Sequence, residues 1–325
     1  MVDLRQTDVL TMSTISRHLV DPELLRVAEL FPPQMLSDKT IEAARSVPLS
    51  LTQALSPGVT RTEHVVPGPN GAPARRLIVL TPDTVSGDTS CLFFIHGGGY
   101  VVGDPESVQS WASGLAKVSR CIVILPTYRL APETRWPAPV DDLHAQYLWL
   151  HQNARMLGID PQRVATGGAS AGGGHAVRLA LRVRETNGPR IHFQLLLGPM
   201  LDDRHPDNPY AGEYVWTRDY DRYGWDSLLG LASGGDGVPT EAVPNRIADL
   251  SGLPPTYIGI GDLDLFTHSC LDFAQRLMAG GVSTELHVYA GGFHGFEYFV
   301  PDAQISKRAL DDVPRALTAA FARRA

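Results

Sequence analysis

The sequence predicts an α/β protein with a mostly parallel sheet covered by helices on both faces. From residue 91 onward, short continuous apolar runs, which are typical of strands buried on both faces, alternate with longer amphipathic segments. Repeated strand–helix units of this kind form parallel sheets. The chain has 325 residues, enough for two domains or for one large domain with an elaboration. Because it contains no internal repeat and no clean linker, we expect one folded unit.

The first 55 residues are expected to be helical. Asp21 and Pro22 fit an N-cap followed by a proline in the first helical turn. The segment Phe31-Pro32-Pro33 would end this helix, and Ser37 would open a second, shorter one. These helices precede the first strand of the sheet.

The sheet is expected to begin with a hairpin and to continue with alternating strands and helices. The hairpin joins 63–66 to 74–82 through a turn that contains Asn70-Gly71. The later strands are expected at 91–98, 121–128, 163–168, 193–200, 255–261 and 283–290. The helices are expected at 106–120, 140–158, 171–187, 268–281 and 302–324, the last one interrupted at Pro314. Residues 202–253 break this alternation, and an insertion of this length is usually functional.

The composition excludes several classes of protein. The chain has 28 Lys and Arg against 35 Asp and Glu, a net charge of −7 and no basic block, which argues against binding to nucleic acid or to an anionic membrane. Its three cysteines form no CxxC pair, so neither a disulfide framework nor a zinc site is indicated. The N-terminus lacks the apolar core of a signal peptide, and no apolar run reaches the ~18 residues that span a bilayer. We therefore expect a cytoplasmic protein that needs no metal or organic cofactor.

The segment 168–172 reads Gly-Ala-Ser-Ala-Gly and fits the G-x-S-x-G motif of a serine nucleophile. Its place between an expected strand and an expected helix is the one this motif requires. The glycines allow a tight turn that exposes Ser170, and the helix N-terminus beneath it offers N–H groups to a developing oxyanion. A phosphate-binding loop would need GxxxxGK[ST] or GxGxxG, and neither sequence occurs.

A second glycine-rich segment, His96-Gly97-Gly98-Gly99, comes directly after the apolar strand residues 91–95. Acyl-transfer enzymes take one oxyanion-hole donor from such a loop and another from the residue after the nucleophile. This pattern predicts an oxyanion hole formed by the N–H groups of Gly98, Gly99 and Ala171. We expect His96 to orient the loop and not to act as the base, because it precedes the serine in the chain.

A base and an acid are expected in loops at the carboxyl ends of later strands, where catalytic residues gather. His294 lies in a glycine-flanked loop just after the last expected strand, whereas His175 and His287 are expected to be structural. Asp262 and Asp264 both follow the strand at 255–261, and spacing alone does not choose between them. Asp202 and Asp203, after the strand at 193–200, are less favoured candidates.

Four ordered motifs resemble the hormone-sensitive-lipase-like branch of the α/β-hydrolases, especially its bacterial carboxylesterases and acetyl-ester hydrolases. The motifs are His96–Gly99, Tyr128–Glu133 with Pro137 and Asp142 beyond it, the Ser170 turn, and His294-Gly295-Phe296. The resemblance runs from about residue 75 to the C-terminus, and the stretch 249–266 looks like the bacterial heroin-esterase type. It implies an α/β-hydrolase fold with a mostly parallel eight-stranded sheet and a helical cap.

The resemblance also bears on the acid. In the family the acid lies ten residues before an alanine of the following helix, which implies Asp264, with Ala274 as the alanine. The sequence departs from the family at Ala169, where an acidic residue is usual, and at Thr267-His268-Ser269, which replace Asp-Glu-Gly. The segment Tyr128–Glu133 is expected to support the oxyanion loop, with Arg129 paired to a nearby carboxylate.

The function that the residues and the resemblance imply is serine-dependent hydrolysis of short-to-medium acyl esters through an acyl-enzyme. Residues 1–55 and 202–253 are expected to form a cap over a core of residues 56–325. Candidates for lining the substrate pocket are Tyr100, Trp111, Tyr214, Trp216 and Phe296. A lactonase or amidase with the same triad, or a non-catalytic ligand receptor on the same scaffold, are the alternatives. Relatives often dimerise through the last strand and helix, and the apolar stripe at 305–321 is compatible with a homodimer.

Overall fold

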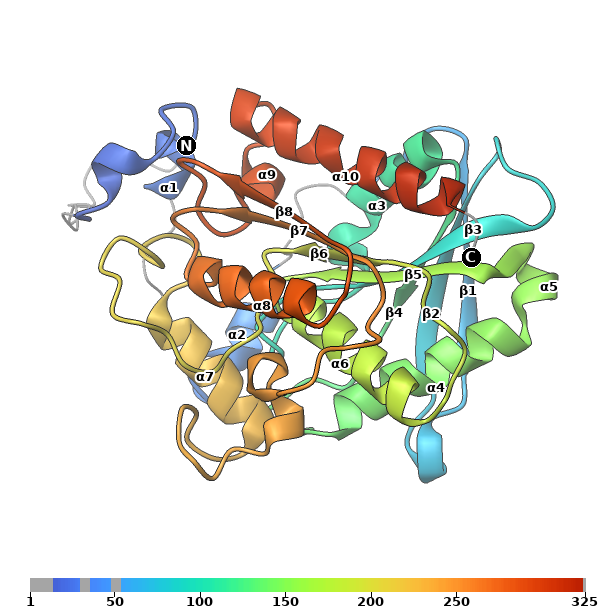
Figure 1. The fold of residues 1–325 in the computed structure, drawn as a ribbon, viewed down its shortest axis with the longest axis horizontal. Helices are drawn as coiled ribbons and strands as arrows, with labels where there is room; N and C mark the ends of the chain where they lie inside the picture. The colour runs from blue at the N-terminus through green and yellow to red at the C-terminus, as the bar shows by residue number, and fades with distance from the viewer. Residues whose placement is uncertain (1–13, 30–35, 48–53, 324–325) are drawn as a thin grey trace, which may run out of the picture.

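An eight-stranded sheet forms the centre of the protein in the computed structural model, which describes residues 14–29, 36–47 and 54–323 (Figure 1). The strand order is β1-β2-β4-β3-β5-β6-β7-β8. The strands are β1 (Val59–Val66), β2 (Arg75–Pro82), β3 (Thr89–Ile95), β4 (Ile122–Pro126), β5 (Ile159–Ala169), β6 (Gln194–Leu197), β7 (Thr256–Gly261) and β8 (Thr284–Tyr289). β2 is antiparallel to β1 and β4, and the other pairs are parallel. The expected mostly parallel α/β sheet is confirmed.

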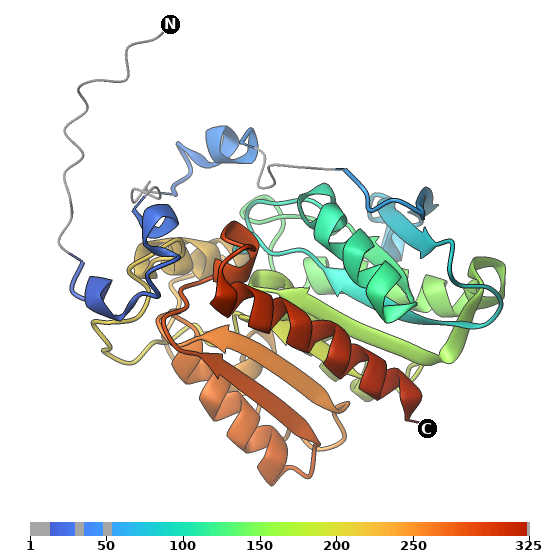
Figure 2. The ribbon, with the colours of Figure 1, turned by 90° about the horizontal axis from the view of Figure 1, so that it is seen from above.

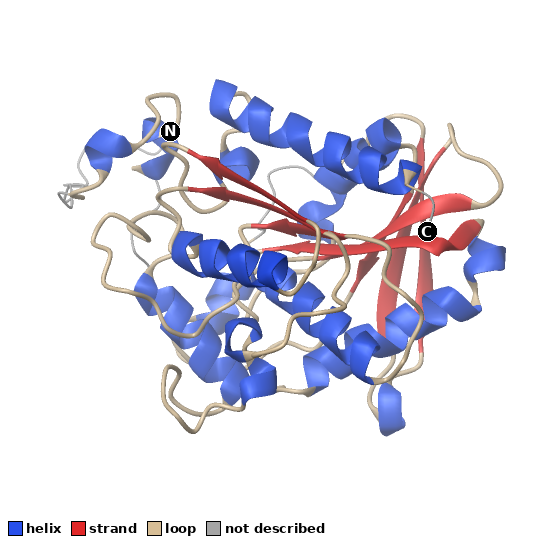
Figure 3. Ribbon diagram, viewed as in Figure 1, coloured by secondary structure: helices blue, strands red, loops and turns tan. Residues whose placement is uncertain are grey.

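Helices cover both faces of this sheet (Figure 3). They are α1 (Leu25–Ala28), α2 (Ile41–Arg45), α3 (Glu106–Ser119), α4 (Ala138–Gln152), α5 (Ala154–Leu157), α6 (Ala171–Glu185), α7 (Arg218–Leu229), α8 (Thr267–Ala279), α9 (Phe296–Phe299) and α10 (Gln304–Ala322). α3 and α10 pack on one face, and α4, α6 and α8 pack on the other (Figure 2). Because strand residues alternate between faces, Phe93 enters the core under α4 and α6, and Phe94 enters the core under α3 and α10.

Some elements differ from the sequence-based expectation. α1 begins only at Leu25, after a turn at residues 22–24, and the expected end of this helix at 31–33 lies outside the described residues. β5 begins at Ile159 and not at 163, because its pairing with β3 already includes residue 159. The interruption expected at Pro314 is wrong, since α10 continues through it. Buried residues on both sides of the proline keep this helix packed on the sheet.

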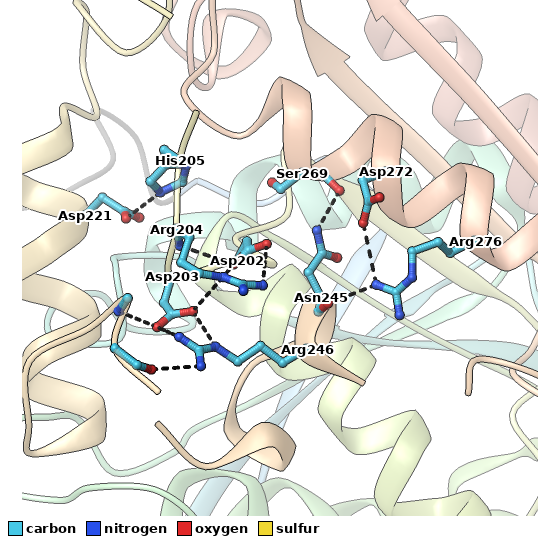
Figure 4. Close-up of polar contacts among 12 residues, drawn as sticks. Asp202, Asp203, Arg204, His205, Asp221, Asn245, Arg246, Ser269, Asp272 and Arg276 are labelled. Carbon is cyan, nitrogen blue, oxygen red and sulfur yellow. Dashed lines mark hydrogen bonds and ion pairs between the residues drawn. The ribbon is translucent and has the colours of Figure 1, made fainter. Parts of the chain in front are cut away.

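The insertion at 202–253 leaves the sheet between β6 and β7 and contains α7. A buried ion pair joins the two ends of the insertion. Arg246 donates from Nε and Nη2 to the two carboxylate oxygens of Asp203 at 2.9 and 2.7 Å (Figure 4). The N-terminal segment lies against this insertion, and Tyr223 of α7 donates a hydrogen bond to Asp38 at 3.0 Å. Two pieces that are far apart in the sequence therefore meet on one side of the sheet (Figure 1). Among the described residues, every helix is too short or too polar to cross a membrane.

Candidate active site

Ser170 occupies the sharp turn between β5 and α6. Its backbone has φ 54° and ψ −124°, a conformation that residues other than glycine rarely adopt. The neighbouring glycines make room for this turn. A Cβ on Gly168 would lie 2.3 Å from the carbonyl carbon of Gly172, and a Cβ on Gly172 would lie 2.1 Å from the oxygen of Ile95. The turn therefore requires glycine at both positions, and it leaves 9% of Ser170 exposed.

His294 lies in the loop after β8 and faces Ser170. Its Nε2 is 3.0 Å from Ser170 Oγ, and its Nδ1 is 2.7 Å from Asp264 Oδ2. Because a carboxylate only accepts, Nδ1 carries the proton and donates it to Asp264. This tautomer leaves Nε2 free to accept the hydroxyl proton of Ser170.

The two aspartates after β7 have different partners. Asp264 is 2% exposed, and its second oxygen, Oδ1, accepts the N–H of Phe266 at 2.9 Å. Asp262 Oδ1 accepts the N–H of Gly291 at 2.7 Å, so this carboxylate holds the loop that leads to His294. Of the two candidates that spacing left open, the structure brings Asp264 to the imidazole.

Two opposing effects set the pKa of His294. Burial favours the neutral imidazole and on its own would lower the pKa. The charge and hydrogen bond of the Asp264 carboxylate, with smaller contributions from Glu297 and Asp221, favour the imidazolium and raise the pKa. The net effect is a pKa above the usual 6.5, so His294 is a stronger base than an isolated imidazole.

The glycine-rich loop after β3 lies against the Ser170 turn. A Cβ on Gly97 would lie 3.2 Å from Ser170 Cβ. Gly98 and Gly99 have positive φ values of 114° and 57°, and no backbone hydrogen bond between described residues uses either N–H. Ala171 is the first residue of α6, where an N–H has no acceptor within the helix. Among the described residues, these three N–H groups have no backbone acceptor, and they belong to the two segments that meet at Ser170.

Comparison with known proteins agrees with this geometry. Residues 92–298 match a family model described as the alpha/beta hydrolase fold. The chain is 34% identical to the carboxylesterase NlhH of Mycobacterium tuberculosis, over 95% of this chain and 100% of that protein. The chain belongs to the hormone-sensitive-lipase-like family of α/β-hydrolases. It is a serine hydrolase of the carboxylesterase type.

Other relatives of this carboxylesterase carry similar names. It is 31% identical to an ethyl acetate hydrolase of Pseudomonas putida over 64% of this chain and 66% of that protein. Among solved structures, a bacterial heroin esterase superposes with a TM-score of 0.85 at 34% identity and covers 94% of this chain and 99% of its own. The esterase LipW from Mycobacterium marinum gives a TM-score of 0.84 at 31% identity, with 94% and 98% covered. The expected α/β-hydrolase fold is confirmed.

The segment Tyr128–Glu133 contacts the glycine-rich loop after β3. Tyr128 donates to the carbonyl of His96 at 3.1 Å, and its ring stacks on the His96 ring at 4.5 Å. Arg129 forms a bidentate pair with the fully buried Asp142, with both distances at 2.8 Å. The start of the segment is thus fixed to the loop through Tyr128 and to α4 through the adjacent Arg129.

The other histidines that sequence analysis assigned to structure are found in structural contacts. Burial lowers the pKa of His96 to about 4, so this ring is neutral, and its Nδ1 is 2.8 Å from the carbonyl of Gly97. His175 is buried between the rings of Tyr100 and Tyr128. His287 pairs with Glu285 and Asp312 at the edge of the sheet. Asp203, a less favoured acid, is held by Arg246.

Of the five aromatic residues expected to line the pocket, the structure brings Trp216 to the site. Its ring centroid is 6.3 Å from that of His294. Tyr100 is 1% exposed and donates its hydroxyl to the carbonyl of Met200, so its ring has no free surface for a substrate. Tyr214 and Phe296 are buried in a cluster with Phe293 and Tyr289, and Trp111 packs on Phe94.

Sequence analysis missed two neighbours of the acid and the base. Phe266 places its ring edge-on to His294 at 5.1 Å. Thr267, which replaces the usual family residue, donates from Oγ1 to the carbonyls of Gly261 and Asp264 at 2.6 and 2.8 Å and so closes the turn that carries the acid. Their position directly after Asp264 was the available signal. Within the described ranges, no group of three His, Cys, Asp or Glu side chains is close enough to hold a metal ion.

Proposed function

We propose that this carboxylesterase hydrolyses short-to-medium acyl esters, with Ser170 as the nucleophile, His294 as the base and Asp264 as the acid that orients the base. The observation that carries the proposal is the continuous line of contacts from Asp264 Oδ2 through the imidazole to Ser170 Oγ, at 2.7 and 3.0 Å. The similarity to an ethyl acetate hydrolase supports an acetyl-type substrate.

In the first half of the reaction, Ser170 forms an acyl-enzyme. Its Oγ attacks the ester carbonyl carbon while His294 Nε2 takes the hydroxyl proton. The N–H groups of Gly98, Gly99 and Ala171 stabilise the negative charge that forms on the carbonyl oxygen. The tetrahedral intermediate then loses its alcohol, and the leaving oxygen takes the proton from Nε2.

In the second half, a water molecule replaces the alcohol. His294 takes a proton from this water, whose oxygen attacks the acyl carbon, and the same three N–H groups bind the oxyanion again. Collapse releases the carboxylic acid, and the proton on Nε2 returns to Ser170 Oγ. Asp264 stabilises the imidazolium in both halves and does not change its protonation state.

We further propose that residues 1–55 and 202–253 form a cap over a catalytic core of residues 56–325. The contacts between the described parts of these two pieces support a common cap, as does the position of Trp216 of the insertion beside His294. The cap would restrict access of water and substrate to Ser170.

The test is a panel of p-nitrophenyl acyl esters, a lactone and an anilide, assayed on the parent and on Ser170→Ala. Ester turnover should fall by at least about 10³-fold in Ser170→Ala, because the nucleophile is lost. Faster Ser170-dependent turnover of the lactone or the anilide would favour a lactonase or an amidase. Absence of Ser170-dependent turnover on every substrate would favour a ligand receptor and contradict the proposal.

A further inference from the structure

A second buried histidine–aspartate pair lies near the triad, and the proposed mechanism does not use it. His205 Nε2 is 2.7 Å from Asp221 Oδ2, and the two side chains are 8% and 3% exposed (Figure 4). His205 follows β6 and Asp221 lies in α7, so both belong to the insertion. Burying a carboxylate is unfavourable unless partners replace its lost hydration. Because burying Asp221 is unfavourable on its own, we look for its role in the groups that it contacts.

One of those neighbours is the indole of Trp216. Its Nε1 donates a hydrogen bond to the second oxygen of Asp221, Oδ1, at 3.4 Å. The residue before it, Val215, has a φ of 60°, which is an unfavourable conformation for a β-branched side chain. Such a backbone conformation persists only where surrounding contacts maintain it. The hydrogen bond that Trp216 Nε1 donates to Asp221 is one of these contacts.

The far edge of the same indole lies on the oxyanion loop. A Cβ on Gly99 would be 2.0 Å from Trp216 Cη2, so the ring occupies the space that a side chain at position 99 would need. The same ring is 6.3 Å from that of His294 between centroids. The indole is therefore close both to a group that would bind the carbonyl oxygen and to the group that would act as the base.

His205 also packs near Phe266, the second aromatic neighbour of His294. The ring of His205 is 6.0 Å from that of Phe266, and Phe266 is edge-on to His294 at 5.1 Å. His205 and Asp221 thus lie behind both of the aromatic rings that flank His294. A change in this pair would move the aromatic rings beside the site without removing a residue of the proposed triad.

We infer that His205 and Asp221 are positioning residues that hold Trp216 against Gly99 and thereby limit the length of the acyl chain accepted beside Ser170. The inference rests on the proposed ester hydrolysis and concerns the substrate range of that same site. Asp221 anchors the indole N–H, and His205 supplies the partner that a buried carboxylate needs. We assign the effect to the acyl chain, which extends from the carbonyl whose oxygen would be bound at Gly99, and a comparison of alcohol sizes distinguishes it from an effect on the leaving group.

The experiment compares kcat/KM for p-nitrophenyl acetate and octanoate in the parent, Trp216→Ala, Asp221→Ala and the double variant. The octanoate-to-acetate ratio should rise at least about tenfold in either single variant, because the ring no longer blocks the longer chain. Since Asp221 acts through the ring, the double variant should match Trp216→Ala. Asp219→Asn is the matched control, because this exposed aspartate lies in the same helix, and its ratio should equal that of the parent.

Several results would overturn the inference. An equal loss on both esters in Asp221→Ala would show a general structural role, and effects that add in the double variant would show that Asp221 does not act through Trp216. A shift with alcohol size in place of acyl length would also contradict it. If Asp221→Ala does not fold, His205→Ala, which removes the partner of the buried Asp221 carboxylate, provides the same comparison. Failure of the proposed function is distinguishable, because the parent would then lack Ser170-dependent turnover of the acetate.

Discussion

At the scale of single residues, the neighbouring aspartates have different partners: Asp264 contacts the imidazole of His294, and Asp262 accepts a hydrogen bond from the loop that leads to it. Asp264→Asn should lower kcat by roughly 10³ to 10⁴-fold, because an amide can hold the imidazole in the wrong tautomer and cannot stabilise the imidazolium. Asp262→Asn should cost about tenfold at most, since the amide oxygen can still accept the N–H of Gly291. Steady-state kinetics on p-nitrophenyl acetate measure both losses. A larger loss in Asp262→Asn would reverse the assignment of the acid.

The raised pKa of His294 predicts the pH dependence of the same reaction. Only the neutral imidazole can take the proton of Ser170, and a raised pKa keeps His294 protonated to higher pH. kcat/KM should therefore be low in acid and rise with a midpoint above 6.5. In Asp264→Asn the midpoint should move down, because burial remains while the carboxylate charge that raises the pKa is gone. Profiles over about pH 5 to 9 test this shift, and a parent midpoint below 6.5 would contradict it.

At the scale of elements, α2 is attached to the oxyanion loop through Arg45. Its Nε and Nη2 donate to the carbonyls of Val101 and Ala131 at 2.8 Å, and its guanidinium also forms a bidentate pair with Glu133. Val101 in turn donates its N–H to the carbonyl of Gly98 at 3.0 Å. One side chain of the N-terminal segment therefore restrains the loop whose N–H groups would bind the oxyanion.

Arg45→Met should accordingly lower kcat by about tenfold and change KM less, because oxyanion donors act through their preorganised positions. The control is Arg26→Met, since Arg26 is an exposed cation on α1, and its kinetics should match those of the parent. Full kcat–KM measurements on p-nitrophenyl acetate distinguish the two variants. An unchanged kcat in Arg45→Met would mean that the loop keeps its shape without α2.

At the scale of the whole molecule, the sequence predicts what depends on local pattern and misses what depends on long-range contact. β3 and β4 were predictable because strands buried on both faces are continuously apolar. Ser170 and His294 were predictable because each lies in a glycine-flanked segment just after an expected strand. Spacing could not choose between Asp262 and Asp264, because both lie within reach of one loop. The His205–Asp221 pair joins two parts of an irregular insertion that carries no periodic pattern, and Pro314 stays helical only because the helix packs on the sheet.

The N-terminal segment and the insertion hold each other through Glu213. Its Oε1 accepts the N–H of Ile15 at 3.1 Å, and its Oε2 accepts the N–H of Ser16 at 2.8 Å and also the Ser16 hydroxyl. Ser16 is fully buried, so its polar groups depend on this carboxylate. The same segment continues to Asp21, whose N–H donates at 3.1 Å to Gly291 in the loop that carries His294. Residues 15–21 thus connect Glu213 of the insertion to the loop that carries His294.

Glu213→Ala should release this segment while the sheet stays folded. Removing the acceptor leaves buried donors of Ser16 unpaired, a cost of about 1–3 kcal/mol, so amide hydrogen exchange in residues 14–29 should become roughly 5 to 150 times faster. Exchange in α3 should not change, because the buried residues of this helix belong to a different core cluster from Val20, Leu24 and Ala28 of the segment. Glu241→Ala, at an exposed glutamate of the same insertion, should leave exchange in 14–29 at the parent rate. Unchanged exchange in Glu213→Ala would mean that other contacts hold the segment in place, and equal acceleration in α3 would indicate a loss of global stability and contradict a local role.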